Sequence, residues 1–214
     1  MPPFVMVNCA MSADGKIALP SRRQTRISSE EDIARVHRLR NSADAILVGI
    51  GTVLADDPSL LVKEKYVRRP RRPLRIVLDS RGRTPAGANV TSPGVPTLIA
   101  LSGEPAGRPW GDNVETVILG DGGRVLIPRL LEELDSRRIN RLLVEGGSEV
   151  IWSFLSERAV DRLMIYVGSL VLGGAGPTPA GGAGAARLEE AFRLRLARAR
   201  RLGDGMLLVY EPER

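Results

Sequence analysis

The chain has 214 residues, of which 43% are hydrophobic and 26% charged, ordinary proportions for a globular protein that exclude an intrinsically disordered chain. The formal net charge of +6 comes from arginine, because Lys16, Lys63 and Lys65 are the only lysines. Two arginine-rich segments, 68–72 and 193–201, raise the question of nucleic acid, but aromatic residues make up only 4% of the chain. A base-stacking surface is not indicated, so we expect these arginines on a solvated surface with no nucleic-acid partner.

His37 is the only histidine and Cys9 the only cysteine. A cluster of histidine metal ligands and the zinc signature of cytidine deaminases are therefore excluded, and no metal site is predicted. The chemistry must come from a cofactor or from carboxylates. The lone cysteine, the lack of an apolar run of about 20 residues and the lack of a signal-peptide pattern at residues 1–4 predict a cytoplasmic protein that spans no membrane.

Short apolar runs predict strands at 4–10, 43–48, 74–78, 97–101, 114–118, 142–144, 162–167 and 205–210. Helices are expected from a capping-box pattern at Ser28–Glu31 to about Asn41, and over 127–137 and 148–156. The charged segment 63–73 and the Gly-rich segment 173–184 are expected as loops. This alternation predicts a single α/β domain over 1–214, with three layers and a mainly parallel sheet that has an antiparallel edge.

A strand-turn-helix element with two glycines stands at Val144–Ser148. Glycines let a ligand approach the backbone, and the free N–H groups at a helix N-terminus bind anions such as phosphate. A tight turn without a ligand explains the same residues, and the dinucleotide fingerprint G-x-G-x-x-G does not occur here in strand-to-helix context. The carboxylate of Glu145 would repel an anion, so we expect it to serve a neutral or cationic part of a ligand.

Two further turns follow predicted strands. Thr52 and Asp56 are four residues apart, so one helical turn would place a hydroxyl and a carboxylate on the same side, a pair suited to a polyol or a carboxamide. Ser80 and Arg81 follow the third strand and offer the hydrogen-bond donors that a 2′-phosphate requires. A capping role for Asp56 and exposed turn charges at 79–83 remain the alternatives.

Taken in chain order, these elements resemble one family, the riboflavin-biosynthesis reductases, which have a dihydrofolate-reductase-like fold. The resemblance rests on Met11–Ile17, Gly49–Leu60, Arg75–Ser80 and Val144–Ser148 and extends over essentially the whole chain. It implies NADPH-dependent reduction of a ribosylaminopyrimidine 5′-phosphate to the ribitylamino compound. In such a reaction the protein mainly orients the reactants and excludes water.

The resemblance also assigns residues. NADPH would be held by Thr52, Asp56, Ser80, Arg81, Gly146, Gly147 and Ser148. The substrate would be faced by Asn8, Arg40, Leu60, Lys63 and Glu145. Glu145, or a water that it holds, is the candidate catalytic group that handles the proton. The family further implies a homodimer.

Two positions depart from the bacterial bifunctional pattern. Lys63 stands where an arginine is usual, which keeps a phosphate-binding charge but not a bidentate fork. Asn8 stands where those enzymes carry lysine, and the archaeal and fungal type resembles this chain. With no deaminase domain in the sequence, this favours the diamino substrate, 2,5-diamino-6-ribosylamino-4(3H)-pyrimidinone 5′-phosphate.

Three alternatives stay open from the sequence. The substrate could be the deaminated 5-amino-6-ribosylaminouracil 5′-phosphate, or the chain could be a dihydrofolate- or pteridine-type reductase. Removing the charge of Arg40 or Lys63 would distinguish a phosphorylated substrate from dihydrofolate or a pteridine. A phosphate-free substrate gives these charges nothing to bind, so its KM should stay unchanged. A basic nucleic-acid-binding module is the third alternative, and it predicts salt-sensitive binding through the two arginine-rich segments.

Overall fold

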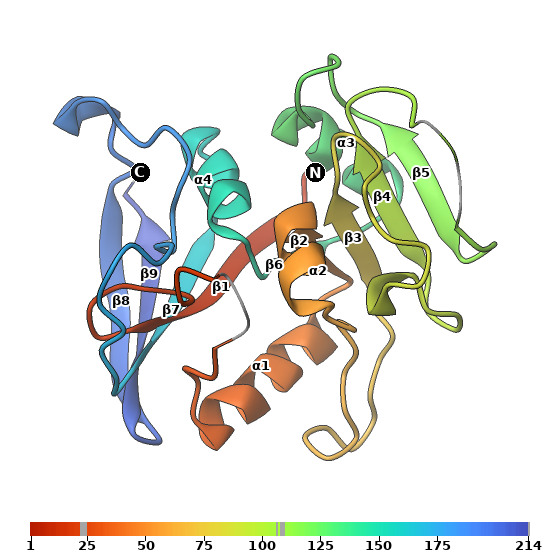
Figure 1. Ribbon diagram of the computed structural model, residues 1–214. Helices are drawn as coiled ribbons and strands as arrows, with labels where there is room; N and C mark the ends of the chain where they lie inside the picture. The colour runs from red at the N-terminus through yellow and green to blue at the C-terminus, as the bar shows by residue number, and fades with distance from the viewer. Residues whose placement is uncertain (22–24, 106, 108–109, 214) are drawn as a thin grey trace. The chain divides into compact units, whose positions relative to one another are not determined.

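The structure is a computed structural model that describes residues 1–21, 25–105, 107 and 110–213 (Figure 1). Two compact units make up the chain. The first unit consists of Met1–Phe4 and His37–Leu143, and the second of Val5–Val36 and Val144–Arg214. Helix α1 (Glu30–Ser42) begins in the second unit and ends in the first.

The strands of the first unit follow the order β5-β4-β3-β2-β6. Their bounds are Ala45–Gly49 (β2), Leu74–Leu78 (β3), Thr97–Leu101 (β4), Val114–Ile118 (β5) and Arg141–Val144 (β6). Parallel pairing joins β2 to β3, β3 to β4 and β4 to β5. Every residue of β2 and of β4 is buried, which explains why these strands are continuous apolar runs without alternation.

Two helices of the first unit follow from simple sequence patterns. In α3 (Ile127–Ser136), Ile127, Leu130 and Leu134 are buried, and their spacing of three and four residues places them on one face. Helix α2 (Ile50–Asp56) directly follows β2 and buries Ile50 and Val53. The turn after β2 is therefore helical and carries both Thr52 and Asp56.

Arg75, the second residue of β3, is completely buried and has no carboxylate partner among the described residues. Its guanidinium instead donates to five neutral oxygens, those of Thr97 Oγ1, Asn89 O, Ser92 Oγ, Ser92 O and Val95 O, at 2.6–3.0 Å. This rigid fork joins two strands to the segment 89–95 and satisfies carbonyls that would otherwise be buried without donors.

The second unit contains β1 (Phe4–Ser12), β7 (Arg162–Gly168), β9 (Gly205–Pro212) and β8 (Leu194–Leu202), in the order β1-β7-β9-β8. Strands β1 and β7 are parallel, whereas β9 is antiparallel to both β7 and β8. Figure 1 shows β8 and β9 as the long blue hairpin. Helix α4 (Ser148–Ser156) buries Ile151, Phe154 and Leu155.

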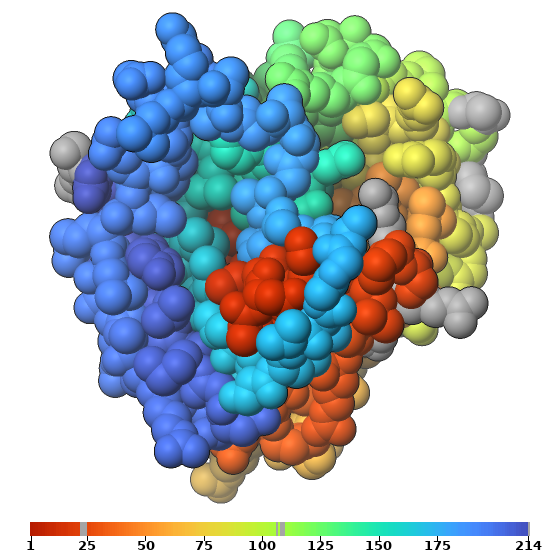
Figure 2. Space-filling view, turned by 60° about the vertical axis from the view of Figure 1, so that its left-hand side comes forward, coloured from red at the N-terminus to blue at the C-terminus, as the bar shows by residue number. Residues whose placement is uncertain are grey.

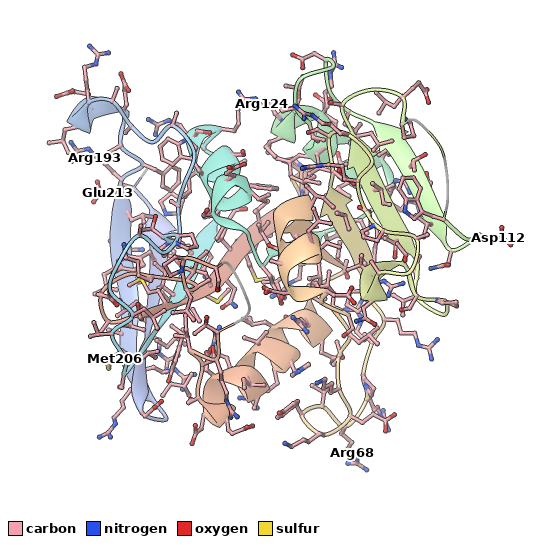
Figure 3. All side chains as sticks on the ribbon, viewed as in Figure 1. Arg68, Asp112, Arg124, Arg193, Met206 and Glu213 are labelled. Atoms are coloured by element: carbon pink, nitrogen blue, oxygen red, sulfur yellow. The ribbon has the colours of Figure 1, made fainter. Side chains whose placement is uncertain are left out.

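The expected α/β class, with mainly parallel strands and an antiparallel edge, is confirmed, and each strand expected from the sequence is present. Strand β8 was not predicted, because seven of its nine residues are exposed and the apolar signal is absent. Arg68 and Arg193 extend away from the ribbon (Figure 3), and both arginine-rich segments are exposed as expected. None of the helices in the described ranges is long and apolar enough to cross a membrane.

The start of α1 differs by one residue from the predicted capping box. The Ser29 hydroxyl oxygen accepts the backbone N–H of Asp32 at 3.2 Å, so Ser29 caps the helix. Ser28 instead donates its hydroxyl hydrogen to the Asp32 carboxylate at 2.6 Å. The hydrogen bond from Ser28 makes Asp32 part of a chain of hydrogen-bonded polar side chains.

Candidate functional site

The β6–α4 turn in the second unit has the geometry that its glycines suggest. Gly146 has φ +119°, a conformation that other residues rarely adopt, and the Gly146–Gly147 peptide is cis. Gly147 is the N-cap of α4, and no side chain in the described ranges caps that helix. The N–H groups of its first turn are therefore available for an anionic ligand.

The Gly-rich loop 173–184 packs against the first turn of α4. Gly181 donates its N–H to the Ser148 carbonyl at 3.1 Å. A Cβ added at Gly181 would lie 2.7 Å from Ser148 Oγ, and one at Gly182 would lie 2.8 Å from the Trp152 ring. Figure 2 shows part of this loop (light blue) beside the segment after β1 (red), where Ile17 donates to the Pro177 carbonyl at 2.8 Å. Glycines therefore permit the close approach that fixes Ser148.

Asn8 and Glu145 are the other predicted site residues of the second unit. Asn8 lies in the middle of β1 and is only 6% exposed. Its Oδ1 accepts a hydrogen bond from Arg35 Nη2 at 2.7 Å. Glu145 is half-buried in the connection between β6 and α4.

In the first unit, α2 carries Thr52 and Asp56 one turn apart, as predicted. Both side chains are half-buried. Asp57 ends the helix with φ 41°, and its carboxylate accepts the N–H of Asn89 at 2.7 Å and the Nδ2 group at 2.9 Å. Asp57 therefore has a structural role at the end of α2.

The turn after β3 is organised by a buried carboxylate. Asp79 is completely buried, and its Oδ2 accepts the Thr84 N–H at 2.6 Å and the Thr84 hydroxyl at 2.8 Å. Arg83 Nε lies 3.8 Å from the other carboxylate oxygen. Ser80 is half-buried and Arg81 is exposed, so the turn is fixed from inside while the arginine side chain faces solvent.

The segment that bears Lys63 is held against α1 by side chains of that helix. Arg40 donates from Nη1 to the Leu61 carbonyl at 3.3 Å. His37 Nδ1 accepts the Lys63 N–H, also at 3.3 Å. The Lys63 side chain is exposed, whereas Leu60 is only 2% exposed and has φ 55°. Arg40 and His37 therefore hold the backbone of residues 61–63 close to α1 in the first unit.

The structure divides the predicted site residues between the units. The first unit holds Arg40, Thr52, Asp56, Leu60, Lys63, Ser80 and Arg81, and the second holds Asn8, Glu145, Gly146, Gly147 and Ser148. Sequence reasoning did not identify His37 and Arg35, although each contacts a predicted site residue. A signal for Arg35 was available in the sequence, because Arg35 follows Asp32 by three positions on one helix, a spacing that allows an ion pair.

Parallel strands followed by turns and helices define an α/β protein, a class in which ligands bind at the carboxyl ends of the strands. Residues 3–208 match the family model described as the RibD C-terminal domain, and the chain belongs to this family. Similar proteins are the 2,5-diamino-6-ribosylamino-4(3H)-pyrimidinone 5′-phosphate reductases of Archaeoglobus fulgidus, at 42% identity, and Methanothermobacter thermautotrophicus, at 38%. In both comparisons 98% of each protein is covered.

The solved structures to which the chain is similar belong to the same family. RibD of Acinetobacter baumannii matches with a TM-score of 0.85 at 25% identity, over all of this chain and 59% of that one. The deaminase/reductase of Thermotoga maritima matches with a TM-score of 0.84 at 27% identity, over 99% of this chain and 57% of that one. The chain thus spans somewhat more than half of such proteins. The expected dihydrofolate-reductase-like fold is confirmed, and the reductase family implies a nicotinamide cofactor in general.

Proposed function

We propose that the chain reduces 2,5-diamino-6-ribosylamino-4(3H)-pyrimidinone 5′-phosphate to its ribitylamino product with NADPH, in riboflavin biosynthesis. The observation that carries this proposal is the similarity over 98% of both archaeal reductases that are named for that substrate. NADPH would supply a hydride to C1′ of the substrate, whose ribose ring opens to an imine. The chain's own residues bind, orient and exclude water.

The residues fit a dinucleotide by their chemistry. Gly146, Gly147 and Ser148 offer an uncapped helix N-terminus to a phosphate. Thr52 and Asp56 offer a hydroxyl and an acceptor to the uncharged part of the cofactor. The exposed Arg81, beside Ser80, supplies a charge for the 2′-phosphate that separates NADPH from NADH. On this proposal, Arg81→Ala raises the KM for NADPH and leaves the KM for NADH unchanged.

On the substrate side, Arg40 and Lys63 would bind the 5′-phosphate as two positive charges, and Leu60 would contact the base. Asn8 and Glu145 would face the reacting sugar and its amine. We assign Glu145, directly or through a water, to the proton that the imine nitrogen takes up as C1′ is reduced. Glu145 is a half-buried carboxylate next to the glycine turn, and a positioned carboxyl group is a common proton donor or acceptor in enzymes, which supports this assignment.

The experiment is a parallel assay of NADPH oxidation with the diamino compound, with 5-amino-6-ribosylaminouracil 5′-phosphate and with dihydrofolate. The proposal predicts the highest kcat/KM with the diamino compound. Preference for the deaminated compound would transfer the assignment to that substrate, and turnover of dihydrofolate alone would make the chain a pteridine-type reductase. Lys63→Met supplies a matched check, because it raises KM only if the substrate carries a phosphate.

We further propose that residues 1–214 act as one reductase domain, that the active form is a homodimer and that it works in the cytoplasm. The family match from residue 3 to residue 208 runs through both units and supports the first point. A single cooperative unfolding transition, seen alike by circular dichroism and by calorimetry, is the expected result. Sedimentation equilibrium measures the second point directly.

A further inference from the structure

A chain of four polar side chains, the half-buried Ser28 and the buried Asp32, Arg35 and Asn8, connects the start of α1 to the middle of β1 within the second unit. The Ser28 hydroxyl donates to Asp32 at 2.6 Å, and Arg35 Nε donates to the other Asp32 oxygen at 2.7 Å. Arg35 Nη2 then donates to Asn8 Oδ1 at 2.7 Å. The Arg35 side chain is 8% exposed and that of Asp32 is 1% exposed, so each charge depends on the other for its stability.

This arrangement fixes the orientation of the Asn8 amide. A guanidinium has donors and no acceptor, so only the amide oxygen can face Arg35. The amide nitrogen therefore points the other way, and it donates no hydrogen bond to any residue in the described ranges. Asn8 is 6% exposed, but its amide nitrogen is not among the fully buried polar atoms that lack a partner, so a ligand oxygen can reach its N–H groups from the solvent side.

The Cys9 thiol, next to Asn8 in the chain, is not a charged group that could bind a ligand. Burial raises the pKa of Cys9 to about 12, although the charge of Arg35 opposes that rise. The thiol is therefore neutral at physiological pH. The amide of Asn8, held by Arg35, is left as the strong polar group of this part of β1.

We infer that Arg35 is a positioning residue that holds the Asn8 amide with its NH₂ group turned to donate to a carbonyl or hydroxyl oxygen of the substrate. The inference rests on the proposed function, in which Asn8 faces the ribosylaminopyrimidine. Asp32 balances the charge of Arg35 and fixes its guanidinium plane. Toward the substrate Asn8 is then a donor, because its amide oxygen is occupied by Arg35.

The test is a double-mutant cycle with Asn8→Ala, Arg35→Met and the double variant, measured by KM, kcat and the Kd of NADPH. Each single change should raise the KM of the diamino compound about 5-fold, which is the loss expected when one hydrogen bond to the substrate is removed. The Kd of NADPH should stay unchanged. The double variant should match Asn8→Ala alone, because Arg35 acts through Asn8. Effects that multiply would overturn the inference.

Arg35→Met leaves Asp32 buried without its partner and can therefore destabilise the fold. Two further variants distinguish a loss of substrate binding from such a folding defect. Arg35→Lys retains a charge and a single donor, and should recover part of the loss in KM. Asn8→Asp keeps the partner of Arg35 and hence the melting temperature, but it offers only acceptors, so the KM should rise at least 10-fold. An unchanged KM in Asn8→Asp contradicts the inference.

Calorimetric titration with the diamino compound separates this inference from the proposed function. If the unaltered chain binds the compound without turning it over, the proposed reaction fails while the cycle, measured in Kd, still supports or overturns the role of Arg35. If the chain does not bind the compound, both proposals fail. Normal turnover with independent effects of the two residues overturns the inference alone.

Discussion

His37 Nδ1 accepts the backbone N–H of Lys63 at 3.3 Å, and the His37 ring stacks on Tyr66 with centroids 4.6 Å apart and planes 10° apart. His37 is the only histidine of the chain and is 5% exposed on α1. It contacts the segment that bears Lys63, a proposed phosphate ligand. The lone histidine therefore acts as an acceptor that places a loop.

Replacing His37 with phenylalanine keeps an aromatic ring for Tyr66 and removes the acceptor for Lys63. We expect the KM for the phosphorylated substrate to rise about 5-fold, because about 1 kcal/mol of hydrogen bonding is lost, while kcat and the Kd of NADPH stay the same. Steady-state kinetics measure all three. A change in the affinity for NADPH with a normal KM would contradict the role given to this contact.

Gly181→Ala should weaken NADPH binding. The added Cβ would lie 2.7 Å from Ser148 Oγ and 3.2 Å from Ser148 Cβ, so the Ser148 side chain or the loop that carries residue 181 has to move. We expect a Kd for NADPH at least 5-fold higher, measured by fluorescence titration. The matched control is Gly87→Ala, which has open space around the new methyl group and should bind NADPH normally.

Asp14 should make stability depend on pH in the acid range. Hydrogen bonds from the Ser12 hydroxyl, the Leu172 N–H and then the Gly173 N–H lower the pKa of this exposed carboxyl from 3.8 to about 2. A lowered folded-state pKa stabilises the fold above the unfolded value, and that contribution is lost as the pH falls from about 4 to about 2.

The variant Asp14→Asn should accordingly melt at a lower temperature than the unaltered chain at pH 6, since the charged acceptor is missing. The difference in Tm should shrink as the pH approaches 2, where Asp14 is itself protonated. Thermal melts between pH 2 and pH 6 give both curves. A gap that is constant or grows toward low pH would show that the carboxylate does not hold Leu172 and Gly173.

Arg75→Lys should lower the free energy of unfolding by about 2–5 kcal/mol, because an ammonium cannot reach the five oxygens of the guanidinium fork and leaves buried carbonyls without donors. Urea denaturation gives this quantity. Arg71→Lys is the control, since the pair of Arg71 with Asp44 is half exposed and its loss costs about 0–1 kcal/mol. Equal effects of the two changes would contradict the account.

Much of the fold could be predicted because local patterns and burial agree. The apolar runs of β3, β4 and β5 gave their bounds without error, and the two glycines before Ser148 marked the start of α4. Strand β8 could not be found in this way, since it pairs with β9 on one side only and carries exposed arginines. Its signal lies in pairing, which an apolar pattern does not carry.

The candidate site was predicted as a set of ligand-facing residues, and the supporting residues were missed. Arg35 looked like any charged residue of an amphipathic helix, and nothing in the sequence showed that it is buried against Asn8. Asp57 and Asp56 are neighbours in sequence, yet only the conformation of the helix end showed which of them is the cap. Long-range partners of polar side chains need the fold.

The most direct test of the central claim is the fate of the cofactor's hydrogen in the product. NADPH labelled with deuterium at the transferring position of the nicotinamide is incubated with the chain and the diamino ribosylaminopyrimidine phosphate, and the product is analysed by mass spectrometry and NMR. We expect a ribitylamino product that carries one deuterium, located at C1′. A product without deuterium at C1′, or oxidation of NADPH with no ribitylamino product, would contradict it.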